Sequence, residues 1–240
     1  IKTAAIPYVV PDTDAWPERL GSVLGVLYLI FNEGYAATSG DTQIRRSLCD
    51  EAIRLTRMLL HLRPSEPETM GLLALMLLHD SRRDARADAD GRLIPLEQQD
   101  RALWLTAQIL EGVTLVEQAL PRGRLGPYQL QAAISAVHAE APSIGETNWH
   151  EIVVLYDLLD QLSPNPVVRL NRAVAVSYAT SAEAALVELE TLRTALDRYQ
   201  PFHATLADCL RRAGRRDDAA RAYTRAIALS TNPHERNFLD

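Results

Sequence analysis

The chain has 240 residues, of which 47% are hydrophobic, 23% are charged and 6% are aromatic. This composition is typical of a folded globular protein and excludes wholesale disorder. The formal net charge of −6 argues against direct DNA binding, because phosphate contacts need an excess of Lys and Arg.

The sequence contains no segment suited to crossing a membrane. Its longest apolar run, Val23–Phe31, is half of the roughly 18 residues that a membrane helix needs. The two cysteines, Cys49 and Cys209, lie in helical patterns and lack CxxC spacing. We therefore expect two reduced, buried thiols in a cytoplasmic protein.

Proline and glycine divide the first part of the chain into helices. Residues 1–17 carry three prolines, which predict an extended lead-in. Apolar residues then recur on one helical face from Glu18 to Asn32, and Gly34 is predicted to end that helix. Two further helices are predicted, one from a cap at Asp41 or Thr42 to about His61, and one over Glu68–His79.

The segment 80–95 is the most irregular part of the sequence. It is polar and dense in charge, and it contains the turn signal Asp90-Gly91. Loops of this length inside compact domains are often functional. The alternative is an extension of the preceding helix that ends in a solvated turn.

Helical patterns continue through the second part of the chain, with prolines between them, and no convincing β-strand interrupts them. The predicted helices cover Leu96–Leu120, Tyr128–Ala141, Asn148–Leu162, Val167–Tyr178, Ala182–Leu196, Phe202–Ala213 and Asp217–Ser230. A cap at Thr147 or Asn148 begins the third of these helices. We expect an all-α fold.

A helix followed by a proline recurs along the chain, ending at Pro64, Pro164 and Pro233. Repeated helical hairpins predict an α-α superhelix. The last pair fits the tetratricopeptide pattern, in which small residues let two helices approach and a large one fills the gap. Its packing residues are Leu206, Ala207, Leu210, Gly214, Ala219, Tyr223 and Ala226. The predicted organisation is a helical domain over 18–163 with degenerate repeats, continuous with tetratricopeptide-like pairs over 164–240.

Motifs for chemistry are absent from the sequence. It has no GxGxxG, no P-loop and no Gly-x-Ser-x-Gly. His150-Glu151 begins a zinc motif, but Val154 occupies the position of the second histidine. A partial calcium loop that starts at Arg86 lacks its first carboxylate ligand. We expect no cofactor, no metal and no enzymatic activity.

Polar and aromatic side chains in otherwise apolar helices must find partners or a ligand. Hydrogen bonds between repeats are one explanation for them, and a binding groove on the concave side is the other. The candidate groove residues are Tyr28, Asn32, Glu33, Tyr35, Arg82, Arg83, Gln98, Asp100, Arg101, Trp104, Tyr128, Gln131, Asn171 and Arg172.

Four of these stretches carry a family resemblance. They are Val26–Tyr35 (VLYLIFNEGY), Leu75–Asp80 (LMLLHD), Gly126–Ile134 (GPYQLQAAI) and Leu170–Ala175 (LNRAVA). Together they resemble bacterial extracytoplasmic-function RNA polymerase sigma factors that carry a long tetratricopeptide-like C-terminal extension. The resemblance covers nearly the whole chain. It implies that the chain corresponds to the extension alone, with residues 1–17 following the promoter-binding sigma domains.

The resemblance implies a regulatory role in transcription initiation, through protein contacts with the sigma core domains, RNA polymerase or another protein. It supplies no catalytic residues. The alternative function is a small-molecule sensor whose ligand pocket is formed by the segment 80–95, Trp104, Tyr128 and Asn32. A third possibility, an enzyme that uses paired carboxylates such as Glu33 and Asp100, has no sequence motif behind it.

Overall fold

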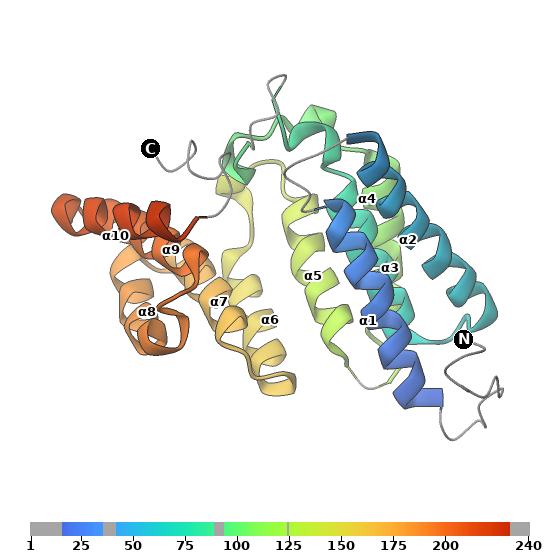
Figure 1. The fold of residues 1–240 in the computed structure, drawn as a ribbon. Coiled ribbons are helices and arrows are strands. Elements are labelled where there is room, and N and C mark those ends of the chain that lie inside the picture. Colours follow the sequence, from blue (N-terminus) through green and yellow to red (C-terminus); the bar gives the residue numbers. More distant parts are fainter. Residues whose placement is uncertain (1–15, 36–41, 89–93, 124, 231–240) are drawn as a thin grey trace, which may run out of the picture.

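The structure, a computed structural model, describes residues 16–35, 42–88, 94–123 and 125–230. Within these ranges the chain forms ten α-helices, several short 3-10 turns and no β-strand (Figure 1). The predicted all-α fold is therefore confirmed. None of the helices in these ranges combines the length and the hydrophobicity that a membrane span requires.

Among the first five helices, α3 lies at the centre and the other four pack around it. The five helices are α1 (Trp16–Tyr35), α2 (Thr42–Leu62), α3 (Pro67–Asp80), α4 (Thr106–Ala119) and α5 (Pro127–Glu140). The α3 helix packs against the other four, and every residue from Thr69 to Leu78 is buried. A helix that is apolar on all sides is stable only inside a protein. This explains why the most hydrophobic predicted helix lies at the centre.

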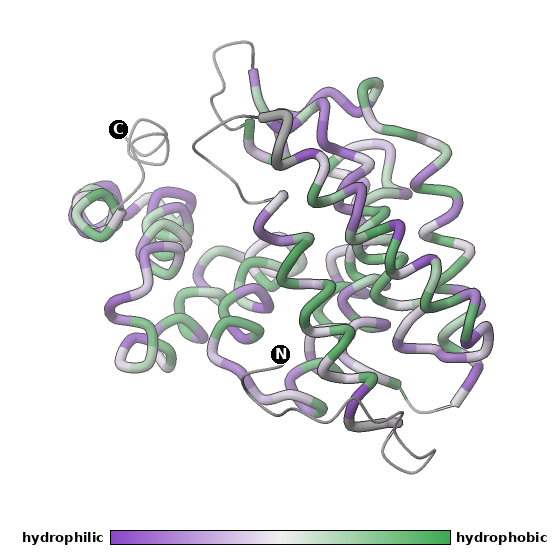
Figure 2. The backbone as a smooth tube through the Cα atoms, turned by 45° about the vertical axis from the view of Figure 1, so that its right-hand side comes forward, coloured by the Kyte–Doolittle hydropathy of each residue, from purple (hydrophilic) through white to green (hydrophobic). Residues whose placement is uncertain are grey.

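The second five helices form a successive array, in which each helix packs on the one before it. They are α6 (Trp149–Leu162), α7 (Pro166–Ala179), α8 (Ala182–Leu196), α9 (Gln200–Arg212) and α10 (Arg216–Leu229). Most of these helices carry both hydrophobic and hydrophilic residues along their length (Figure 2). Such helices bury one face against each neighbour, so the array extends away from α5.

Local sequence signals set several helix boundaries. The Asn148 side chain accepts a hydrogen bond from the backbone N–H of Glu151, which confirms the predicted cap of α6. Ser181 caps α8 in the same way. Gly214 adopts a φ of 76° at the turn between α9 and α10, a left-handed conformation that glycine adopts without strain.

The residues predicted to pack the last helical pair lie between α9 and α10. Five of them are buried, namely Leu206, Ala207, Leu210, Ala219 and Ala226. Tyr223 is partly buried and packs against the same core. The small alanines allow the two helices to approach closely.

The structure corrects three sequence predictions. The first helix begins at Trp16, with Pro17 in its first turn, and continues through Gly34 to Tyr35. Proline suits the first turn because the N–H it lacks has no partner there. Residues 96–105 form two 3-10 turns, Leu96–Gln98 and Arg101–Leu103, instead of an α-helix.

Tertiary contacts explain the 3-10 turns. The backbone N–H of Leu105 donates to the carbonyl oxygen of Ser81, at 2.8 Å, and Arg101 donates to carbonyl oxygens at the end of α5. These contacts hold the segment across the helix ends. The expectations for residues 1–15, Asp41, Asp90-Gly91 and Pro233 lie outside the described residues.

Candidate binding groove

Two adjoining cavities form a groove along one side of α5. Their volumes are about 780 Å³ and about 420 Å³, and both are lined by Tyr28, Pro127 and Gln131. The larger cavity lies between α1, the α2–α3 turn and the start of α5. The smaller one is lined by residues of α1, α3, α5, α6 and α7. The groove thus joins the first five helices to the successive array.

The larger cavity combines aromatic rings with charged groups. Tyr28 and Tyr128 meet edge to face, with ring centroids 5.5 Å apart. The Arg63 guanidinium lies 4.5 Å from the centroid of the Trp16 ring. Glu66 and Glu68 also line this cavity. The mixture of aromatic faces and carboxylates favours an amphipathic occupant with a basic group.

Glu68 ties the groove to the start of α5. Its carboxylate accepts hydrogen bonds from the backbone N–H groups of Tyr128 and Gln129, at 3.2 and 3.1 Å, and from the Gln129 side chain. An acidic group at a helix N-terminus is favourable, because the first N–H groups have no partner within the helix. Burial nevertheless raises the pKa of Glu68, against the effect of these hydrogen bonds.

The smaller cavity has only uncharged polar groups in its wall. They come from Tyr28, His79, Gln131, Ser135, Tyr156, Ser163, Asn165 and Asn171. His79 Nε2 lies 3.2 Å from Ser135 Oγ. Burial, reinforced by the charges of Arg82 and Arg86, lowers the pKa of His79 to about 3, so that the imidazole is neutral. Burial also raises the pKa of Tyr156 to about 12, which keeps its hydroxyl protonated.

A basic–aromatic cluster lies at the C-terminal ends of α1 and α3. It consists of Tyr35, Arg82, Arg86, Arg101 and Trp104, in which guanidinium groups and aromatic rings alternate. The guanidinium carbon of Arg86 lies 3.6 Å from the Tyr35 ring centroid. Those of Arg82 and Arg101 lie 5.7 and 4.4 Å from the centroid of the Trp104 ring. Arg82 also donates to the Tyr35 hydroxyl, at 3.1 Å.

His79 connects this cluster to the groove. Its ring stacks on Tyr35, with centroids 5.2 Å apart, and it also lines the smaller cavity. His79 is therefore in contact with both the cluster and the smaller cavity.

The structure divides the predicted groove residues among several places. Four of them, Tyr28, Tyr128, Gln131 and Asn171, line the groove. Tyr35, Arg82, Arg101 and Trp104 belong to the basic–aromatic cluster. Asn32 does not line the groove but hydrogen-bonds to the Tyr28 side chain, which does.

The remaining predicted residues belong to neither the groove nor the basic–aromatic cluster. Arg83 pairs with the buried carboxylate of Asp80, at 3.1 Å. Glu33, Gln98 and Asp100 are exposed, and the Asp100 side chain accepts a hydrogen bond from the backbone N–H of Ala102.

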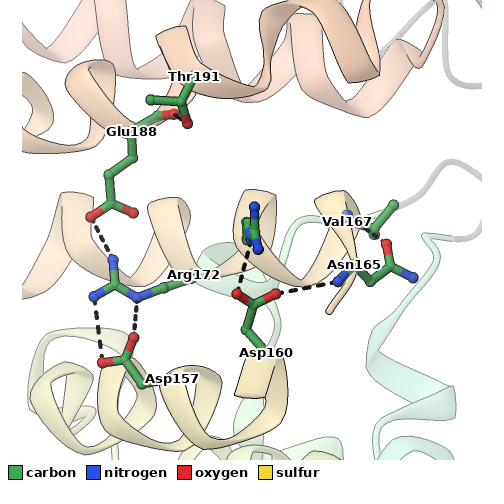
Figure 3. Close-up of polar contacts among 8 residues, drawn as sticks. Asp157, Asp160, Asn165, Val167, Arg172, Glu188 and Thr191 are labelled. Carbon is green, nitrogen blue, oxygen red and sulfur yellow. Dashed lines mark hydrogen bonds and ion pairs between the residues drawn. The ribbon is translucent and has the colours of Figure 1, made fainter. Parts of the chain in front are cut away.

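Arg172 joins three helices. It donates to Asp157 on α6, at 2.7 Å, and to Glu188 on α8, at 2.5 Å, from its own position on α7 (Figure 3). These two hydrogen bonds raise its pKa. A guanidinium held by two carboxylates has a structural role, because its fork is already occupied.

Sequence reasoning overlooked several residues at these sites, namely Trp16, Glu68, His79, Arg86, Ser135 and Tyr156. A signal existed for two of them. His79 is a titratable residue at the end of an otherwise apolar helix, and Glu68 stands in the first turn of that helix. Nothing in the sequence indicates that Tyr156 faces α5. Among the described residues, no group of three or more His, Cys, Asp or Glu side chains could hold a metal ion.

Comparison with known proteins adds two similarities. Residues 19–120, which cover α1 to α4, match the model of a family of unknown function, DUF6596. An uncharacterized protein of Rhizobium meliloti (strain 1021) is 47% identical over 239 residues. The match covers 100% of this chain and 56% of that protein, so the chain spans about half the length of this relative.

Proposed function

We propose that this chain is a regulatory binding module that holds a segment of a protein partner in the groove beside α5. The observation that carries the proposal is the pair of adjoining cavities of about 780 and 420 Å³, lined by aromatic and aliphatic side chains together with polar and charged groups. Grooves of this kind in helical arrays commonly receive partner segments.

The resemblance to extracytoplasmic-function sigma factors gives the proposal a biological setting. In this setting the chain is the C-terminal extension of such a factor, and the partner segment belongs to the sigma core domains or to RNA polymerase. The Rhizobium relative is longer than the chain, which leaves room in that protein for the sigma domains. The extension would then control transcription initiation by contact with protein, without contacting DNA.

A pair of glycines on α1 allows a matched test. Gly21 lines the larger cavity, whereas Gly25, one turn later, does not. A Cβ atom added at either position meets no atom within 4 Å, so both positions accept a side chain. We expect Gly21→Phe to fill the cavity and to leave the fold intact, and Gly25→Phe to serve as the control.

The measurement is the affinity of the chain for a separately purified two-domain sigma core and for RNA polymerase. In Gly21→Phe the new side chain occupies space that the partner needs in the groove. We therefore expect this substitution to weaken binding by roughly tenfold or more, which corresponds to about 1.4 kcal/mol. Gly25→Phe should bind as the unmodified chain does. The proposal is wrong if neither partner binds, or if the two variants bind equally well.

A specific observation also favours the alternative, a small-molecule sensor. The smaller cavity has the volume of a small-ligand site and a wall of uncharged hydrogen-bonding groups. A neutral polar metabolite that binds there would raise the melting temperature by mass action. Substitution of Asn171, which is exposed on the cavity wall, should abolish that shift and leave the affinity for the sigma core unchanged.

A further inference from the structure

Unpartnered polar atoms concentrate in one region of the molecule. Among the described residues, seven buried side-chain nitrogen or oxygen atoms have no hydrogen-bond partner. Six of them lie on residues 83–108 or on His138, whose carbonyl oxygen accepts a hydrogen bond from Arg101. Buried polar groups are normally paired, so this concentration calls for an explanation.

Two of these atoms are donors within the basic–aromatic cluster. They are Nη2 of Arg101 and Nε1 of Trp104. The Trp104 side chain is only 5% exposed, and an indole N–H can donate but cannot accept. Both residues therefore present N–H groups that require an acceptor, and no described side chain or carbonyl oxygen supplies one.

The same cluster carries positive charge that no ion pair among the described residues offsets. Among the described residues, none of the ion pairs involves Arg82, Arg86 or Arg101. The nearby carboxylates are already engaged, Asp80 with Arg83 and Asp84 with Arg46. The charge of Arg82 also lowers the pKa values of Arg86 and Arg101, after the larger effect of burial.

Helix ends account for part of this arrangement. Arg86 donates to the carbonyl oxygen of Tyr35 at the end of α1, and Arg101 donates to those of His138 and Ala141 at the end of α5. The C-terminus of a helix carries only about half a negative charge. Three full positive charges therefore exceed what these ends offset. Among the described residues, the Arg82 guanidinium contacts the Tyr35 hydroxyl and the Trp104 ring.

We propose that the basic–aromatic cluster binds an oxyanion, the carboxylate or phosphate group of a small molecule. Arg82 and Arg101, whose guanidinium groups lie near the Trp104 ring, supply the charge, and Trp104 Nε1 supplies a directed donor. All three arginines are partly exposed, so an anion can approach their charges from solvent, and a local rearrangement must then uncover Arg101 Nη2 and Trp104 Nε1, which are buried. An oxyanion satisfies donors and charge at the same time, which a cation or an apolar group cannot do.

This site is separate from the groove, and the inference does not depend on the proposed function. The site is nevertheless next to the groove. Tyr35 contacts both Arg82 and Arg86, and its ring stacks on His79, which lines the smaller cavity.

Two of the three tryptophans, Trp104 and Trp149, provide a matched pair of variants. Trp104→Phe removes the unpartnered donor and retains an aromatic ring beside the arginines. Trp149→Phe also removes an indole N–H, but that group already donates to the carbonyl oxygen of Ile144, at 3.2 Å. Only Trp104→Phe should therefore weaken the binding of an anion. A third variant, Arg82→Gln, removes charge while keeping a polar side chain.

The experiment titrates inorganic phosphate and, separately, acetate into the full chain at constant ionic strength, with chloride as the control, and follows the melting temperature and the tryptophan fluorescence. We expect phosphate, acetate or both to raise the melting temperature of the unmodified chain and of Trp149→Phe. In Trp104→Phe and Arg82→Gln the affinity should fall roughly tenfold, as is typical when a hydrogen bond to a charged group is lost.

Each outcome decides the inference. A response to phosphate alone or to acetate alone identifies the class of ligand. No response beyond that of chloride means that the donors meet only water, and this overturns the proposal. Equal responses in all four proteins also overturn it, because binding would then be elsewhere. Urea unfolding of each variant without anion checks that a lost response is not a lost fold.

Discussion

At the scale of single residues, the ends of α1, α3 and α5 show how a histidine can be kept uncharged in contact with a groove. His79 is packed against Tyr35 and lies near the positive charges of Arg82 and Arg86. Burial and these charges act in the same direction, because each disfavours the imidazolium ion. Burial also lowers the pKa of His138 to about 4, with further effects from Arg82 and Arg101.

These lowered pKa values predict that acid destabilises the fold. The imidazoles keep their ordinary pKa of 6.5 in the unfolded chain, so the unfolded state takes up protons first as the pH falls. Stability should begin to fall below about pH 6.5 and continue to fall toward pH 3 to 4. The expected loss between pH 7 and pH 5 is roughly 2 kcal/mol from His79, with a comparable amount from His138.

Urea unfolding at pH 7, 6 and 5 measures this loss. His79→Gln, which cannot be protonated, should show a smaller decrease over the same range. A decrease equal to that of the unmodified chain would mean that His79 is already accessible to protons in the folded state.

The sequence shows only part of the chemistry at this scale. Tyr28, Tyr128 and Gln131 were predicted to line a groove, and they do line the described cavities, because aromatic and polar residues stand out in apolar helices. Arg172 was also predicted to line the groove, yet its guanidinium is hydrogen-bonded to the carboxylates of Asp157 and Glu188. Its partners lie 15 and 16 residues away, and residue type alone does not reveal such pairs.

At the scale of helices, the contact between α3 and α5 depends on a single glycine. A Cβ atom at Gly71 would lie 2.6 Å from the backbone nitrogen of Gln129 and 2.8 Å from its Cα atom. Backbone atoms cannot move aside as a flexible side chain can. The two helices would have to separate, and the core of the first five helices would open.

We therefore predict opposite effects for two substitutions of the same kind. Gly71→Ala should lower the free energy of unfolding by about 1–3 kcal/mol or more, through overpacking. Gly25→Ala should raise it by up to about 1 kcal/mol, because alanine favours helix and the position is open. Chemical denaturation of the two variants provides the comparison. Similar stability of both would show that α5 can shift without cost.

Helix boundaries were predicted well where a cap marks them, as at Asn148 before α6, and less well at the start of α1, where Pro17 lies in the first turn. The 3-10 turns of residues 96–105 were not predicted, because the leucines of this segment are spaced as in a helix. Their conformation depends instead on Ser81 and on the end of α5, which are distant in sequence. Local propensity cannot include such partners.

At the scale of the whole molecule, the segment between α3 and α4 reaches across to the successive array. The Tyr178 hydroxyl on α7 donates to the carboxylate of Glu97, at 2.9 Å. The same tyrosine ring stacks on Trp149, with centroids 4.3 Å apart, and lies under the guanidinium of Arg212. This contact joins parts of the chain that are 81 residues apart.

Removal of the hydroxyl tests this connection. Tyr178→Phe keeps the stacked ring and should change global stability by no more than about 1 kcal/mol. Amide hydrogen exchange over residues 94–105 should become faster, because the segment loses an anchor. Tyr199→Phe, at the exposed residue just before α9, is the control. Unchanged exchange in both variants would mean that other contacts hold the segment.

The repeated helical pairs predicted the general architecture, since each amphipathic helix needs a neighbour. The central position of α3 followed less directly, from its lack of a polar face. The Glu97–Tyr178 contact could not be foreseen, because it depends on how the first five helices and the array meet.

The groove also has two unlike ends. Charged groups, Arg63, Glu66 and Glu68, occur only in the larger cavity, whereas the wall of the smaller one is uncharged. A bound peptide with a basic residue near one terminus can satisfy this pattern in a single direction only. The order of residues in a partner, and not its composition alone, should then determine recognition, and a peptide of reversed sequence should be a poor ligand.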